Sequence, residues 1–427
     1  MSAHYTDPRY RRARYACYLT NLTMAASANL PPLLFLTFRA CYGISFTLLG
    51  LLVLLNFCTQ LGMDLLFSFF SYRFDARRAL RLMPALSFTG MVIFAVFPPL
   101  FPSAAYLPLV AGTLLFSAAG GLAEVLVNPV IAAIPTDDPA REISRLHSTY
   151  AWGTVLVVLL STLFLALAGR DRWYILALLW AVVPLFSFFL FLTAHLPQIQ
   201  SEQEKTKAGG SLSGGRLLCL FVACIFCGGA AECTMSQWCS GYLEAALGIP
   251  KLYGDIFGMA LFALMLGMGR SLYSRRRTQI FPVLFSGMTA AFFLYLTAAL
   301  SPLPILGLFA CALTGLATSM LWPGSLLLLG EKSPRTGIAV YALMAAGGDC
   351  GAAVAPQLVG LLADKVAAAP FAASLAGRLS IPVGQLALKA GMLSASLFPL
   401  AGVLVLFLLR RKLKKSDPLR TSPLQGK

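Results

Sequence analysis

Twelve long apolar stretches constrain the fold of this chain more than any other feature of its sequence. Each is long enough to cross a bilayer, which takes about 20 consecutive apolar residues in an α-helix. Only 12% of the 427 residues are charged, against about 25% in soluble proteins. There are thus too few charged residues to cover the surface of a soluble protein of this size. The sequence therefore predicts an all-α, polytopic membrane protein. We expect no large catalytic domain, no enzymatic activity and no cofactor.

The hydropathy along the chain gives the positions of the spans. They are predicted at 16–38, 44–70, 82–101, 106–133, 146–168, 173–195, 217–244, 251–271, 280–300, 305–329, 337–364 and 386–409. A polar, Gly/Ser-rich segment at 196–216 separates the sixth span from the seventh and has the composition of a flexible linker. The predicted organisation is a six-helix bundle at 1–195, the linker at 196–216, a second six-helix bundle at 217–409 and a basic tail at 410–427.

The positions of the basic residues predict how the chain is oriented. Its net charge is +16, and 26 of its 33 Lys and Arg residues fall on the side of the termini when the predicted spans are followed. The positive-inside rule assigns such a side to the cytoplasm. We therefore expect a multi-pass protein of the plasma or inner membrane with cytoplasmic termini. Its surroundings are then the lipid bilayer, and nucleic acid is not a partner.

The two halves share a short internal repeat. A shift of 194 positions aligns GLAEVLVNPVIAAI at 121–134 with GLATSMLWPGSLLL at 315–328, so that Pro129 matches Pro323. The same shift aligns Gly153 with Gly347. Parallel six-helix repeats with a substrate site at the midplane between them are typical of secondary transporters.

The whole chain resembles the major facilitator superfamily. Arg73 and Arg77 match two positions of that family's D-R-x-G-R-R/K loop signature, in which Tyr72 and Asp75 stand in place of the Asp and the Gly. The resemblance implies twelve transmembrane helices in two pseudo-symmetric six-helix bundles. It also implies gating or ion-pathway roles for Arg73 and Arg77.

A closer resemblance is to the fucose permease branch of sugar–proton symporters. The shared positions are Glu124, Asn128 and Pro129 in the fourth span, His147 and Gly153 in the fifth, and Ala231, Glu232 and Trp238 in the seventh. The acidic residue of that branch's first helix is missing from ANLPPLLF. The resemblance implies proton-coupled uptake of a sugar, with His147 at a gate or on the ion pathway.

Glu124 is the predicted proton carrier. It lies about midway along the fourth span, where an acidic residue costs about 2.5–3.5 kcal/mol and normally faces a cavity lined by protein. A setting of low polarity favours the neutral form of a carboxyl group, so alternating exposure lets the group carry a proton. The alternative is a structural hydrogen bond between the fourth and fifth spans.

The other acidic residues inside the spans have several interpretations. Glu232 is expected to bind substrate hydroxyls or an amine, or else to form a structural salt bridge. Asp349 lies among glycines. Four roles stay open for it: it binds a cation, pairs with an Arg, moves with a gate or makes a packing contact. Asp64 is interpreted as structural. Three acids near span ends receive no role because water reaches such positions easily: Glu244, Asp255 and Asp364.

Aromatic and amide side chains complete the predicted binding site. Apolar faces of sugars pack on aromatic rings, while their hydroxyls bond to amides. The candidate aromatic residues are Trp152, Trp238 and Trp322, and the candidate amides are Asn56, Gln60, Asn128, Gln237 and Gln357. The ten cysteines have no metal-ligand spacing, and those in the spans are interpreted as buried apolar side chains.

Prolines inside three spans remove backbone donors. The carbonyls that lose their helical partner are those of Ser27 and Ala28 through Pro31 and Pro32, of Val125 through Pro129, and of Ser319 through Pro323. A carbonyl in hydrocarbon needs a donor, so we expect these breaks to face a cavity or a neighbouring helix.

The sequence favours a proton-coupled symporter of a small polar solute, with a sugar as the preferred substrate and sodium as the alternative coupling ion. Two other functions stay open, namely a proton antiporter that exports amphipathic compounds and a non-transporting membrane sensor. A membrane enzyme and an ATP-driven pump are disfavoured, because no HExxH, GxSxG or phosphate-loop motif is present. We expect the chain to act as a monomer.

Overall fold

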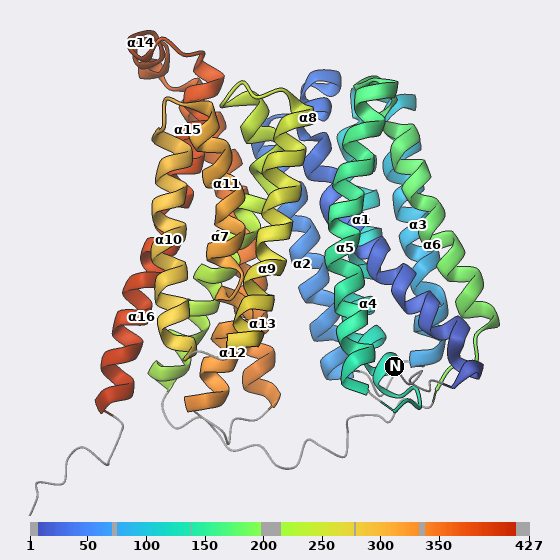
Figure 1. Cartoon of the computed structure of the whole chain (residues 1–427). Helices are drawn as coiled ribbons and strands as arrows, with labels where there is room; N and C mark the ends of the chain where they lie inside the picture. The colour runs from blue at the N-terminus through green and yellow to red at the C-terminus, as the bar shows by residue number, and fades with distance from the viewer. Residues whose placement is uncertain are drawn as a thin grey trace, which may run out of the picture.

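The computed structural model describes residues 7–70, 75–137, 139–197, 215–276, 279–332 and 338–415. Within them, long helices stand side by side in two groups, α1–α6 and α7–α16 (Figure 1). The start of α1 and the end of α16 lie at the same end of the bundle, here called the terminal face, and the other end is called the opposite face.

The first half contains six long helices, as predicted. They are α1 (Arg11–Tyr42), α2 (Phe46–Phe70), α3 (Ala76–Leu100), α4 (Tyr106–Ala132), α5 (Pro139–Ala168) and α6 (Trp173–Thr193). Helices α1, α3 and α5 begin before the predicted spans, because each has a polar first turn or two at the terminal face. The N-cap of α3 is Asp75, whose side chain accepts hydrogen bonds from the backbone N–H groups of Arg77 and Arg78.

The second half has the same plan with more interruptions. It contains α7 (Gly215–Ala245), α8 (Lys251–Gly254), a π-helical segment (Asp255–Ala260), α9 (Leu261–Arg276), α10 (Ile280–Leu300), α11 (Pro304–Thr318), α12 (Leu321–Lys332), α13 (Ile338–Ala368), α14 (Pro370–Leu379), α15 (Val383–Ala395) and α16 (Leu397–Lys415). The tenth predicted span is thus two helices that meet just before Pro323. The hydropathy did not predict α14, which is short and stands at the opposite face (Figure 1).

Eleven segments among the described residues are long and apolar enough to cross a membrane. Helix α1 falls short in hydropathy although it has 32 residues, because it carries buried polar side chains such as Thr20, Asn21 and Asn29. It packs against α4, α5, α6 and α7. Its polar side chains therefore contact protein, whereas those of a peripheral helix would face lipid. With α1 as the twelfth span, the described residues contain the predicted twelve.

Close helix crossings confirm the internal repeat. A Cβ at Gly121 of α4 would lie 2.8 Å from the Gln60 carbonyl oxygen of α2. The matching Gly315 of α11 meets the Phe262 carbonyl of α9 in the same way. Glycine is needed at both positions because the backbones touch, and the two halves therefore share one packing plan.

Most of the predicted linker and tail lies outside the described residues, as does Arg73. The domain boundaries at 195, 217 and 409 therefore remain predictions.

Candidate functional site

The two halves are joined near the opposite face by acidic side chains of the second half. The Asp364 carboxylate of α13 accepts hydrogen bonds from the backbone N–H groups of Phe46 (3.2 Å) and Thr47 (2.6 Å) at the start of α2. A carboxylate is favoured there because a helix N-terminus is partly positive. Nearby, Glu244 at the end of α7 pairs with Arg170 of the first half.

A third contact of this kind is fully buried. The Asp255 carboxylate is 0% exposed and accepts from the Thr162 hydroxyl of α5 at 2.9 Å. It also pairs with the Lys251 ammonium at 3.0 Å, which in turn donates to the Ser240 hydroxyl at 2.9 Å. The expectation that water solvates Asp255 was wrong, because the π-helical segment that it begins packs against both α5 and α7. We call Asp364, Glu244 and Asp255 the acidic latch.

Trp238 makes aromatic contacts between the two halves, beside the latch. Its ring lies edge-on to Phe35 of α1 and Phe46 of α2, with centroid distances of 5.4 and 6.0 Å. Its indole N–H donates to the Pro356 carbonyl at 2.9 Å, and the side chain is 1% exposed. The structure thus places Trp238 at the closed interface between the halves, away from Glu124.

Helix α5 shows where the interface opens. His147 and Tyr150 are exposed. Farther along α5, toward the opposite face, Thr162 is buried and bonds to Asp255 of the second half. The second half therefore covers α5 near the opposite face, whereas α5 is accessible nearer the terminal face, so the space between the halves opens toward the terminal face.

Glu124 faces this space within a group of three carboxyl groups. It is accessible to solvent, and its carboxyl group lies close to that of Asp64 of α2. Asp349 of α13, in the other half, is close enough for its charge to act on both. Two carboxyl groups can share a hydrogen bond only when one of them carries a proton, so this pair forms a site that can take up a proton. Asp64 had been interpreted as structural, and its position beside Glu124 adds it to the candidate site.

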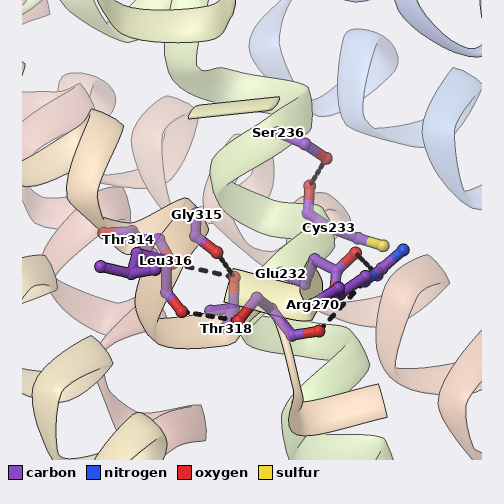
Figure 2. A network of polar contacts seen from close by, with 9 residues as sticks. Glu232, Cys233, Ser236, Arg270, Thr314, Gly315, Leu316 and Thr318 are labelled. Atoms are coloured by element: carbon purple, nitrogen blue, oxygen red, sulfur yellow. Dashed lines mark hydrogen bonds and ion pairs between the residues drawn. The ribbon is translucent and has the colours of Figure 1, made fainter. Parts of the chain in front are cut away.

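Glu232 has a different partner. One carboxylate oxygen accepts from an Arg270 guanidinium N–H at 3.1 Å, and the other is buried with no hydrogen-bond partner in the structure (Figure 2). The Arg270 Nε–H donates to the Ser319 carbonyl at 3.1 Å. This is the carbonyl that Pro323 leaves without its helical donor, so Arg270 fills the predicted break between α11 and α12.

A second proline-freed carbonyl is also satisfied from a neighbouring helix. The Gln237 amide of α7 donates to the Ala28 carbonyl of α1 at 3.4 Å. The prediction that the breaks face neighbouring helices is thus confirmed for Ala28 and Ser319. Helix α4, in contrast, runs through Pro129 without interruption.

The remaining predicted residues are distributed around these groups. Trp322 packs its ring against Gly229 of α7 and Gly348 of α13, beside Asp349. Asn128 has a buried side-chain oxygen without a hydrogen-bond partner. The other amides lie at helix crossings: Gln60 against Gly120 and Gly121, Asn56 against the Ser117 hydroxyl, and Gln357 against Gly50.

Three more candidates lie at the edge of the site or outside it. His147 is exposed and close enough to Arg270 for their charges to interact across the two halves. Trp152 lies in a groove between α1 and α5, on the side of α5 away from Tyr150. Arg77 is exposed in the first turn of α3, and the structure does not bring it to Glu124.

Arg270 is the main residue that sequence reasoning missed. It lies at the end of the predicted span 251–271 and received no role there, whereas α9 continues to Arg276 and places it inside the helix. Two signals pointed to it, since both the Ser319 carbonyl and Glu232 required a donor. Three cysteines also differ from expectation, because Cys58, Cys219 and Cys350 are exposed. Cys58 and Cys350 lie near each other across the halves.

A family model described as Major Facilitator Superfamily matches residues 16–356. This chain belongs to the Major Facilitator Superfamily. Membership agrees with the two six-helix halves, with the interface between them, and with a role in transmembrane transport. A search of curated proteins found no match to the sequence.

Solved structures of other superfamily members share the fold. A bacterial homologue of the human lysosomal transporter Spinster, in an inward-facing and occupied conformation, is 16% identical with a TM-score of 0.74, covering 96% of this chain and 99% of that one. A D-xylose–proton symporter is 15% identical with a TM-score of 0.68, covering 92% and 97%. The fucose–proton symporter of E. coli is 14% identical with a TM-score of 0.56, covering 95% and 99%.

Proposed function

We propose that this protein is a proton-coupled symporter that moves a small polar solute across the cell membrane by alternating access. The observation that carries the proposal is the nearness of the Glu124 and Asp64 carboxyl groups, which face the space between the halves and can take up a proton between them. Its neighbour Asp349 belongs to the other half, so movement of the halves changes the charge near the pair. That change is what couples proton release to opening.

We further propose a sugar as the substrate. Two of the solved structures with this fold are a D-xylose–proton symporter and a fucose–proton symporter. The proposed binding groups are Glu232, Asn128 and Trp322, because a carboxylate, an amide and an aromatic ring together suit the hydroxyls and the apolar face of a sugar. Trp152 and Trp238 are left out because they lie away from this group.

The proposed orientation places the terminal face in the cytoplasm. The excess of Lys and Arg on that side supports it. In this orientation the structure is open to the cytoplasm and closed by the acidic latch on the outside.

The test uses proteoliposomes that contain the full chain and a pH-sensitive dye. A panel of sugars is added without an imposed gradient, and proton movement is recorded for the wild type and for Glu124→Gln. We expect one class of sugar to drive proton entry, with the signal lost in the variant. Silence across the panel from folded, inserted protein would overturn the sugar proposal, and the same signal in Glu124→Gln would remove Glu124 as the proton carrier.

A further inference from the structure

A groove of about 820 Å³ lies between α1 and α5 and belongs to none of the contacts described above. The two helices meet at Gly153, where a Cβ would lie 3.1 Å from the Leu22 side chain. They stay in contact toward the terminal face, where Asn21 donates to the Leu146 carbonyl at 2.9 Å and Tyr18 donates to Glu142. Trp152 and Leu156 line the groove and lie on the side of α5 away from Tyr150, so the groove opens to the membrane and not to the space between the halves.

One end of the groove is positively charged. Arg14 and Arg145 both line it, and they share one counter-ion, Glu142, at 3.7 and 2.6 Å. Tyr18 donates a further hydrogen bond to the same carboxylate at 3.0 Å. The Arg14 Nε–H is buried without a hydrogen-bond partner in the structure. Two cations against one anion leave a net positive charge and an unused donor at this end.

The rest of the groove is apolar. Trp152, Leu156 and Leu159 follow each other along one face of α5 and are 68%, 44% and 38% exposed. Tyr15 of α1 faces them from the other wall. The groove is therefore amphipathic along its length, with guanidinium groups near the terminal face and aromatic and aliphatic side chains farther in.

The length of the groove matches one leaflet of a bilayer. From Arg145 to Leu159 there are 14 helical steps, or about 21 Å at about 1.5 Å per residue. Half of a bilayer with its headgroups measures about 20–22 Å. The guanidinium groups thus fall at the depth of the phosphates, and Leu159 falls near the ends of the acyl chains.

We infer that this groove binds an anionic glycerophospholipid of the leaflet at the terminal face. The lipid phosphate lies between Arg14 and Arg145, because guanidinium groups bind phosphate through charge-assisted hydrogen bonds. One acyl chain lies along Trp152, Leu156 and Leu159. The inference does not depend on the direction of transport or on the substrate.

Tryptophan fluorescence of the purified full chain in detergent tests the inference. Phosphatidylglycerol with brominated acyl chains is titrated in, with brominated phosphatidylcholine as the neutral lipid. We expect quenching by phosphatidylglycerol at concentrations about tenfold or more below those for phosphatidylcholine, and loss of that quenching in Trp152→Phe. Equal quenching by the two lipids, or unchanged quenching in Trp152→Phe, would overturn the proposal. This test requires no substitution of an arginine.

Charge variants then locate the headgroup. Arg14→Gln combined with Arg145→Gln should remove the preference for phosphatidylglycerol, whereas Arg12→Gln, an exposed arginine of the same helix outside the groove, should keep it. Glu142→Gln should strengthen phosphatidylglycerol binding, because the competing carboxylate is gone. A loss of preference in Arg12→Gln equal to that in the double variant would contradict the assigned headgroup position.

Discussion

In the first half, Glu124 lies beside another carboxyl group, whereas in the second half Glu232 lies beside Arg270. Among the described residues, neither Glu124 nor Asp64 forms an ion pair with a basic side chain. A second carboxyl group nearby favours uptake of a proton, whereas a neighbouring guanidinium group favours the charged form of a carboxylate. The comparison supports our proposal that the first half handles the proton and that the second half presents charged groups to the substrate.

The largest effect is expected from Glu124→Gln, which removes the titrating group of the first half. A potential of 100 mV is worth about 2.3 kcal/mol per proton, or about a 50-fold concentration ratio. We expect substrate accumulation in vesicles to fall from about this ratio to equality, while exchange of labelled for unlabelled substrate continues. Glu232→Gln should show the reverse, with weakened exchange. Equal behaviour of the two variants would end the division of roles.

Arg270→Ala should have the next largest effect, on stability as well as on binding. It leaves the Glu232 carboxylate and the Ser319 carbonyl without their donor, and an unpaired buried polar group costs about 1–3 kcal/mol. We expect a lower midpoint of thermal unfolding and substrate affinity at least tenfold weaker. Arg275→Ala, an exposed arginine farther along α9, is the matched control and should change neither.

Asp364→Ala tests the latch by shifting the balance between conformations. Its two bonds to the first turn of α2 exist only while the opposite face is closed, and a hydrogen bond to a charged group contributes about 1.5–3 kcal/mol. We expect a membrane-impermeant maleimide applied from the terminal face to label Cys58 and Cys350 several-fold more slowly. Lys365→Ala removes a neighbouring exposed charge and should leave labelling unchanged. Faster labelling in Asp364→Ala would show that the latch does not hold the closed side.

The smallest effect is expected from Pro323→Ala. The new backbone N–H at position 323 can donate to the Ser319 carbonyl, so α11 and α12 can join into one helix. We expect slower amide hydrogen exchange around residues 320–324 and a change in stability of about 1 kcal/mol or less. Pro129→Ala should change exchange less, because α4 is already continuous there. An equal response at both prolines would show that the break does not depend on Arg270.

Most of the fold could be predicted from the sequence because a bilayer requires long apolar helices. All twelve predicted spans correspond to helices, and Pro323 correctly marked the break in the tenth. Helix α14 was missed because it is short and lies outside the apolar spans. The π-helical segment at Asp255 was missed because hydropathy carries no information about backbone hydrogen bonding.

The site was predicted less completely because it depends on which helices meet. Glu124 and Glu232 were recognised from the cost of a charge in hydrocarbon. Their partners Asp64 and Arg270 could not be assigned, because they come from other helices. The latch residues were dismissed for the same reason, since nearness to a span end shows access to water only when no other helix covers the residue.

The bond from Arg270 to the Ser319 carbonyl has a consequence for how this protein can evolve. Proline removes a donor at this point and arginine supplies one, so the two residues act as a single unit. If Arg270 is replaced first, the Ser319 carbonyl has no donor. If Pro323 is replaced first, the backbone N–H at position 323 and the Arg270 side chain compete for that carbonyl. We therefore expect Pro323 and Arg270 to occur together across related sequences, and Pro323→Ala to restore part of the stability that Arg270→Ala removes.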